Sequence, residues 1–315
     1  MELNIILSCI IVVLSIIMLW KGADWLVDSA AEIAHSFKVS DLIIGLTVVA
    51  FGTSAPEFAV TISAAFTKQT DISIGNVIGS NIFNLGFILG GTAIIRPITI
   101  SQKLFNRDGL FLLMTSALIF FLFFGFNGWD IKDSFTKIEG SLLFMLLIGY
   151  IIFLFVKKDP PEEVHPTTAT RSSYLYFFIG LVMIVSGGHL MVEHASNVAR
   201  YMGISDWVIA VTIVAAGTSA PEFATSISAA LKGRHGIAVG NLIGSDLFNL
   251  LGVLGLAGII NPSSISQDIY SSTFILVLMV GLTLLMMRTF WRISRVEGII
   301  LVSINLIRWY YDLSA

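Results

Sequence analysis

One seven-residue segment occurs twice in this chain, and each copy places a glutamate inside a long apolar run. The copies, both reading GTSAPEF, occupy residues 52–58 and 217–223 and lie 165 positions apart. A carboxylate at the centre of a bilayer costs about 2.5–3.5 kcal/mol on insertion scales, so acidic residues in such runs are rare and usually functional. The pair constrains the fold, because both glutamates need polar surroundings inside an otherwise apolar structure.

The composition predicts an all-α integral membrane protein. Of the 315 residues, 56% are hydrophobic and only 12% are charged, whereas soluble domains average about 25% charged residues. About ten apolar runs are long enough to cross a bilayer, which takes roughly 20 helical residues. The single cysteine, Cys9, excludes an internal disulfide and a thiolate metal cluster.

The two halves of the chain form a repeat. Fifteen of the 19 positions in residues 47–65 are identical to residues 212–230, and the GN-x-IGS-x-x-FN segment of 75–84 returns at 240–249. Because five spans per half is an odd number, the second half must enter the membrane from the opposite side, as in transporters with inverted repeats. We therefore expect ten transmembrane helices in three parts: a first repeat (1–156, alpha-1 motif 45–90), a cytoplasmic linker (157–173) and a second repeat (174–315, alpha-2 motif 210–255).

Basic residues predict the orientation of the spans. With the N-terminus outside, the cytoplasmic loops hold 12 Lys and Arg residues and the outer segments hold five, as the positive-inside rule requires. We expect a multi-pass protein of the cell membrane with both termini outside.

A proline lies in the middle of one span in each repeat. Pro56 and Pro221 each follow a Gly-Thr-Ser sequence, and proline is tolerated at the start of a helix but not in its interior. We expect helices 2 and 7 to be broken there, leaving free carbonyls at the end of the first half-helix. Such a break is tolerated in a membrane only where it is buried in protein or lines a cavity.

The residues around these breaks are ligands that suit a hard cation. Calcium takes about six to eight oxygens from carboxylates, carbonyls and water. The motifs supply two carboxylates with carbonyl and hydroxyl oxygens beside them, from Glu57, Glu222, Thr53, Thr218, Ser54 and Ser219. A helix cap or a buried ion pair is the alternative role for the glutamates. Since neither span core contains Lys or Arg, ion binding is the better interpretation.

Two further pairs of polar residues lie four positions apart, and therefore on one helix face. They are Ser80 with Asn84 and Ser245 with Asn249. We expect them opposite the broken helices as hydroxyl and amide ligands. The alternative is that small residues here only permit close helix packing.

The paired motifs resemble the two alpha repeats of the sodium/calcium exchanger family, of prokaryotic type, within the calcium/cation antiporter superfamily. The resemblance implies exchange of calcium against sodium by alternating access, without a cofactor, with spans 1 and 6 sliding across the other eight. It implies a calcium site at Glu57, Glu222 and the carbonyls of Thr53 and Thr218, with Asn84 and Asn249 lining the centre. It places sodium beside the glutamates, at Ala50, Ala215, Ser54, Ser219, Ser80 and Ser245.

The coupling ion stays open at this point. Some family members carry Asp where this chain has Asn249, and Asp246 replaces the Asn found at its repeat partner, Asn81. A proton-coupled or potassium-dependent antiporter using the same site is the alternative to sodium coupling. An occluded midplane site argues against a channel, and no nucleophile elbow or metalloprotease signature supports an enzyme. The expected partners are the ions and membrane lipid, not nucleic acid, and we expect a functional monomer.

Overall fold

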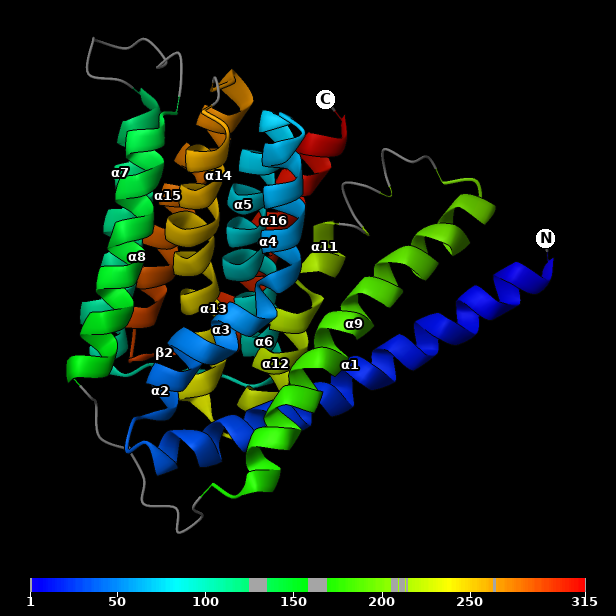
Figure 1. The fold of residues 1–315 in the computed structure, drawn as a ribbon, viewed down its shortest axis with the longest axis horizontal. Helices are drawn as coiled ribbons and strands as arrows, with labels where there is room; N and C mark the ends of the chain where they lie inside the picture. The colour runs from blue at the N-terminus through cyan, green and yellow to red at the C-terminus, as the bar shows by residue number, and fades with distance from the viewer. Residues whose placement is uncertain are drawn as a thin grey trace.

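Helices make up almost all of the part of the chain that the structure describes (Figure 1). The computed structural model describes residues 2–124, 135–157, 169–204, 209, 213, 215–262 and 265–314. Short π-helical segments, labelled η, interrupt several α-helices. The first half contains α1 (Glu2–Ser36), α2 (Asp41–Ile44), η1 (Gly45–Val49), α3 (Ala50–Thr53), α4 (Ala55–Phe66), α5 (Thr70–Phe83), η2 (Asn84–Leu89), α6 (Gly90–Ile95), β1 (Ile98–Thr99), η3 (Leu104–Gly109), α7 (Leu110–Phe124) and α8 (Lys137–Lys157). The second half contains α9 (Arg171–Tyr201), α11 (Ala215–Thr218), α12 (Ala220–Leu231), α13 (His235–Leu247), η5 (Phe248–Val253), α14 (Leu254–Ile260), α15 (Gln267–Arg288), β2 (Arg292–Ile293) and α16 (Arg295–Ser314).

Seven of the described helices are long and apolar enough to cross a membrane. The number rises to eight if residues 41–53 and α4 are counted as one span bent by 50°. An all-helical membrane protein is therefore confirmed, whereas the total of ten helices and the inversion of the repeats stay predictions. The antiparallel pairing of β1 with β2, two residues each, is the one described sheet.

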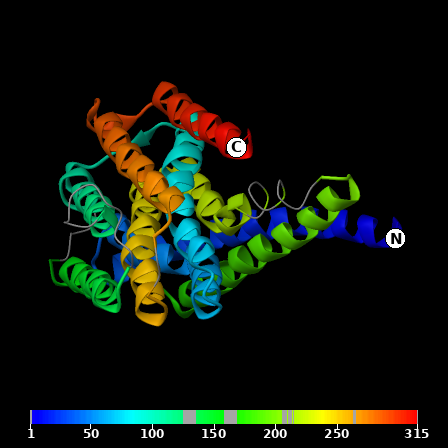
Figure 2. The same cartoon turned by 90° about the horizontal axis from the view of Figure 1, so that it is seen from above.

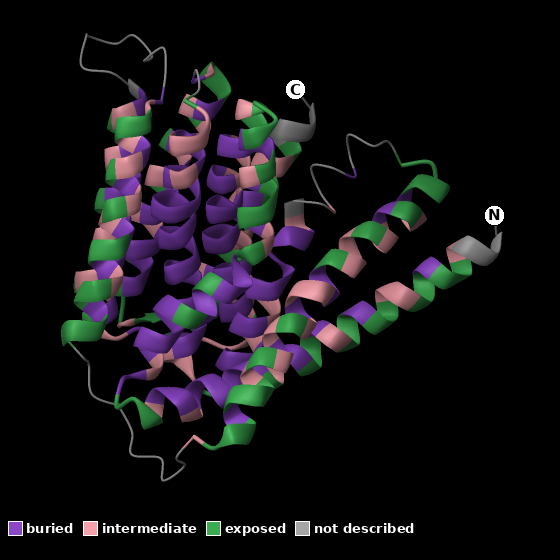
Figure 3. Cartoon of the chain, viewed as in Figure 1, coloured by how far each residue is buried: buried purple, intermediate pink, exposed green. Residues whose placement is uncertain are grey.

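The centre of the molecule is built from two equivalent helices, one from each repeat. In the apolar stretch of the α5–η2–α6 segment 72% of the residues are buried, and in that of the α13–η5–α14 segment 83% are. Both segments are mostly buried in Figure 3. Their equivalence matches the 165-residue offset of the sequence repeat. The broken helices pack against these two helices.

The longest helices, α1 and α9, pack against each other and extend away from the bundle (Figures 1 and 2). Only 22% of the residues in the apolar stretch of each helix are buried. Glycines let their backbones approach: a Cβ added at Gly180 would lie 2.7 Å from the carbonyl oxygen of Gly22, a contact typical of packed membrane helices. The helix α9 begins at Arg171, before the predicted residue 174, because Thr170 and Ser173 form a capping box.

Both predicted helix breaks are present. The helix α3 ends at Thr53 and α4 begins at Ala55; likewise α11 ends at Thr218 and α12 begins at Ala220. Each proline lies in the first turn of its second half-helix, where its missing N–H has no helical partner to lose. Each second half-helix begins one residue before its proline.

The ends of four helices repeat as well. In each case the second residue after the helix adopts a left-handed conformation, and the next N–H donates to a carbonyl five residues back at 2.8–3.0 Å. The first repeat uses lysine where the second uses glycine: Lys38 (φ 56°) with Gly203 (φ 81°), and Lys68 (φ 60°) with Gly233 (φ 77°). Glycine adopts this conformation without strain, so the second repeat has the residue that suits it better.

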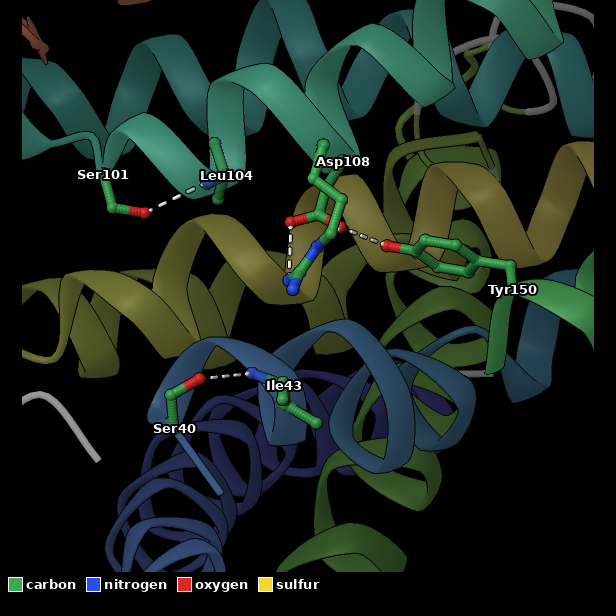
Figure 4. A network of polar contacts seen from close by, with 7 residues as sticks. Ser40, Ile43, Ser101, Leu104, Asp108 and Tyr150 are labelled. Atoms are coloured by element: carbon green, nitrogen blue, oxygen red, sulfur yellow. Dashed lines mark hydrogen bonds and ion pairs between the residues drawn. The ribbon is translucent and has the colours of Figure 1, made fainter. Parts of the chain in front are cut away.

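A polar network joins α8 to the segment before α7 (Figure 4). The Tyr150 hydroxyl donates a 2.8 Å hydrogen bond to the buried carboxylate of Asp108, which also pairs with Arg107 at 2.7 Å. Nearby, Ser40 caps α2 by accepting from the Ile43 N–H at 3.3 Å. These contacts lie outside the repeated motifs and hold the surrounding helices in place.

Candidate ion-binding site

The two motif glutamates meet inside the protein. Glu57 and Glu222 lie in the first turns of α4 and α12 and are 1% and 0% exposed. Ser219 donates a 2.8 Å hydrogen bond to Glu57 Oε1, and Ser54 donates a 3.1 Å bond to Glu222 Oε1. The carboxylates are near enough to interact electrostatically. Each repeat thus supplies the hydroxyl that binds the glutamate of the other.

The second oxygen of each carboxylate has no hydrogen-bond donor. Glu57 Oε2 and Glu222 Oε2 are buried without a partner, and among the described residues neither glutamate forms an ion pair with Lys, Arg or His. Buried charges are normally paired or coordinated to a metal, because leaving water unpaired is costly. A cation is the group that would satisfy both oxygens.

The two threonines that end the first half-helices lie beside these carboxylates. Thr53 interacts with Glu222 and Thr218 with Glu57. The Thr53 hydroxyl also lies 3.2 Å from the Ala50 carbonyl. Ala215 begins α11, but its side chain lies outside the described part of the structure. The side chains of both threonines are therefore positioned next to the glutamates, at the ends of the first half-helices.

The central helices contribute the remaining candidates. Ser245 lies 3.4 Å from Glu222 Oε1, and Ser80 is buried at the equivalent position of α5. Asn84 and Asn249 are also buried, and their side-chain oxygens lack hydrogen-bond partners. Both lie in π-helical segments, which occur frequently at functional sites.

Two residues of the repeated motifs have a role that we did not predict. Asn76 donates to Thr61 Oγ1 at 3.0 Å and to the carbonyl of Glu57 at 3.4 Å. Asn241 makes the equivalent bonds to Ser226 and to the carbonyl of Glu222, at 3.3 and 3.5 Å. The two amides fasten α4 to α5 and α12 to α13. The sequence does contain a signal for this role, because an asparagine is the second residue of both GN-x-IGS segments.

Neutral oxygens would supply the rest of the coordination. Within the described ranges, no three His, Cys, Asp or Glu side chains lie close enough to hold a metal together. An ion at Glu57 and Glu222 would take its other ligands from hydroxyls, amides and helix-end carbonyls, the mixture that calcium and other hard cations accept.

Known proteins of one family resemble this chain over most of its length. The family model described as "Sodium/calcium exchanger protein" matches residues 7–156 and 172–310. The chain belongs to this family. It is therefore an exchanger-family antiporter of the membrane and not an enzyme, as the sequence predicted.

Full-length relatives of this exchanger come from bacteria and archaea. The putative antiporter CaxA of Alkalimonas amylolytica is 35% identical, over 94% of this chain and 96% of its own length. The sodium/calcium exchanger MaX1 of Methanosarcina acetivorans is 32% identical, over 95% and 96%. Among solved structures, the sodium-calcium exchanger NCX_Mj without Na+ and Ca2+ is 32% identical, with a TM-score of 0.84 over 96% of this chain and 98% of its own.

Proposed function

We propose that this exchanger moves calcium against sodium by alternating access at a site centred on Glu57 and Glu222. The observation that carries the proposal is the reciprocal pair of serine–glutamate hydrogen bonds. These bonds leave one oxygen of each buried carboxylate without a partner. The names of MaX1 and NCX_Mj, both sodium/calcium exchangers, support the choice of ions.

The charge of the site suits the two ions in different ways. Two carboxylates balance one calcium ion, or partly balance several sodium ions. Calcium would bind the glutamates and the carbonyls of Thr53 and Thr218. Sodium would use the same carboxylates with neutral oxygens from Ala50, Ala215, Ser54, Ser219, Ser80 and Ser245, while Asn84 and Asn249 would line the centre. Because the ions share oxygens, binding of one excludes the other.

Coupling follows from the electrostatics of the empty site. Two unpaired carboxylates are costly to enclose in a low-dielectric interior. An ion-loaded site can therefore change sides, whereas an empty one does so poorly. Alternation between the two loaded forms gives exchange and prevents a leak of either ion.

The proposal includes a ten-helix architecture with inverted repeats, a cell-membrane location with both termini outside, and a functional monomer. Its moving part is the α1–α9 pair. These helices pack closely on each other at Gly22 and Gly180 and bury little of their apolar surface. A pair attached in this way can slide as a unit across the central helices.

Transport by purified protein in liposomes tests the proposal. Calcium-45 uptake is measured with sodium, potassium and proton gradients imposed one at a time. An outward sodium gradient alone should drive uptake. Uptake driven only by a proton gradient, or only when potassium is present, would assign the alternative coupling ion to the same site. Uptake at channel-like rates would reject the exchange mechanism.

A further inference from the structure

A third carboxylate, that of Asp246, is buried where the two repeats meet. Asp246 is 0% exposed and lies near the end of α13. Its Oδ1 accepts a 3.0 Å hydrogen bond from Asn84 Nδ2, and its backbone carbonyl accepts a 3.1 Å bond from Asn81 Nδ2. Its Oδ2 is buried and has no hydrogen-bond partner. No described Lys, Arg or His forms an ion pair with it.

The repeat shows what this carboxylate replaces. Asn249 Nδ2 donates a 3.1 Å bond to Asn81 Oδ1, which mirrors the bond from Asn84 to Asp246. At the position corresponding to Asp246 Oδ2, Asn81 has its amide nitrogen, which donates to a carbonyl of the other repeat. The change from Asn to Asp therefore turns a satisfied donor into an acceptor without a donor.

Two more acceptors without donors belong to the same chain of hydrogen bonds. Asn84 Oδ1 and Asn249 Oδ1 are both buried and unpartnered, while their amide nitrogens are already engaged. The contacts run without interruption from Asn84 through Asp246 and Asn81 to Asn249. A group of buried oxygens that carries a negative charge and lacks donors is the environment that a cation stabilises.

The groups around Asp246 suit a singly charged ion. Asp246 does not form one metal-holding cluster with Glu57 and Glu222, since no three acidic side chains of the described part of the protein do so. One carboxylate with neutral amide oxygens matches a single positive charge and the hard-oxygen preference of alkali-metal ions. Calcium, with its double charge, is better matched by the two glutamates.

We infer that Asp246, with the side-chain oxygens of Asn84 and Asn249, forms a subsite for one alkali-metal cation beside the two-glutamate site. The role of this cation in transport rests on the proposed function. The cation would either be co-transported or set the net charge that each transport cycle moves. The test below measures binding, so it does not depend on whether a sodium gradient drives calcium flux.

The test compares wild type with D246N and with the exchanged pair N81D/D246N, which moves the carboxylate to the equivalent position of the other repeat. Binding of sodium-22, rubidium-86 (in place of potassium) and calcium-45 is measured on detergent-purified protein. D246N should bind one fewer alkali cation, or bind it at least tenfold more weakly, and should keep its calcium affinity within about threefold. N81D/D246N should recover the lost cation, and the isotope affected identifies it as sodium or potassium.

The dependence of thermal unfolding on added alkali ions supplies a readout that a merely structural role would not move. Without alkali ions, D246N should unfold at a higher temperature than wild type, because it removes a buried charge and restores a donor at this position. Added sodium or potassium should stabilise wild type more than D246N. Alkali-ion binding by D246N equal to that of wild type would overturn the inference, as would loss of calcium binding together with the alkali cation. Failure of sodium-driven flux in wild type would instead count against the proposed function.

Discussion

Ser219 donates a 2.8 Å hydrogen bond to Glu57, although 162 residues separate them in the sequence. Ser54 and Glu222 form the reciprocal bond at 3.1 Å. Each serine lies between the two half-helices of its own repeat and donates a hydrogen bond to the carboxylate of the other repeat. The site therefore forms only when the repeats are docked.

Replacing either serine by alanine should weaken ion binding. A hydrogen bond to a charged group is worth about 1.5–3 kcal/mol, so S54A and S219A should each reduce calcium affinity about 10- to 100-fold. Isothermal titration of purified protein measures this. The matched control is S63A, which removes an exposed hydroxyl from α4. Affinities of S54A and S219A equal to that of S63A would show that the serines do not orient the glutamates.

The glutamates themselves should be indispensable. E57Q and E222Q keep the shape of the side chain but remove one of two buried charges, a loss that we place at about 3–5 kcal/mol and hence more than about 100-fold in calcium affinity. Sodium-driven calcium-45 uptake should vanish in both. The control is E193Q, whose parent side chain is 56% exposed on α9. Uptake that survives in either glutamine variant at the level of E193Q contradicts the proposed site.

The packing of α13 against the first half of the broken helix should not tolerate a side chain at Gly244. A Cβ added there would lie 2.7 Å from the carbonyl oxygen of Leu46 and 2.7 Å from the Cβ of Ala50. Overpacking of this kind costs about 1–3 kcal/mol, so G244A should lower the unfolding temperature and slow transport. In contrast, G149A adds a Cβ that meets no described atom within 4 Å. It should be neutral or stabilising by up to about 1 kcal/mol.

An ion-pair cluster joins α1 to the end of α12, and the equivalent residue of the first repeat cannot form it. Lys232 lies 3.3 Å from Asp24 and 2.8 Å from Asp28, and its repeat partner is the uncharged Thr67. Because these side chains are partly exposed, the pairs contribute at most about 1 kcal/mol. K232T should shift the equilibrium between the two transport states away from the one described here by up to about fivefold.

Distance measurements between spin labels on α1 and α12 test this prediction. The shift should shrink in high salt, which screens exposed charges. The exchanged pair D28K/K232D should restore the wild-type populations in part, because it rebuilds an ion pair between positions 28 and 232 but not the one with Asp24. Equal populations of the two transport states in wild type and K232T would show that the cluster does not influence this equilibrium.

The Tyr150–Asp108 bond should matter for stability and not for ion selectivity. Y150F keeps the stacking of this ring on Phe111, whose centroid lies 4.9 Å away, but removes the donor to a buried carboxylate. We expect a loss of about 1–3 kcal/mol, seen as a lower unfolding temperature, with an unchanged sodium-to-calcium ratio in flux assays. Y174F, at a 48% exposed tyrosine, is the control and should change neither.

Much of the fold was predictable because the membrane restricts what a chain can do. Apolar runs of helical length, two mid-span prolines and two glutamates without basic neighbours predict helices, breaks and a cation site in turn. The structure confirms the helices and both breaks, at Ser54 and Ser219. These predictions depend on local rules: where a helix can continue, where it must stop, and which charges lipid excludes.

Other features depend on how the repeats dock, and the sequence alone does not contain that information in readable form. Nothing local says that Ser219 binds Glu57 and not Glu222, or that Asn81 and Asp246 face each other across the interface. Two equivalent motifs allow either pairing. Only the tertiary structure decides between them, because hydrogen bonds act over about 3 Å while the partners lie more than 160 residues apart.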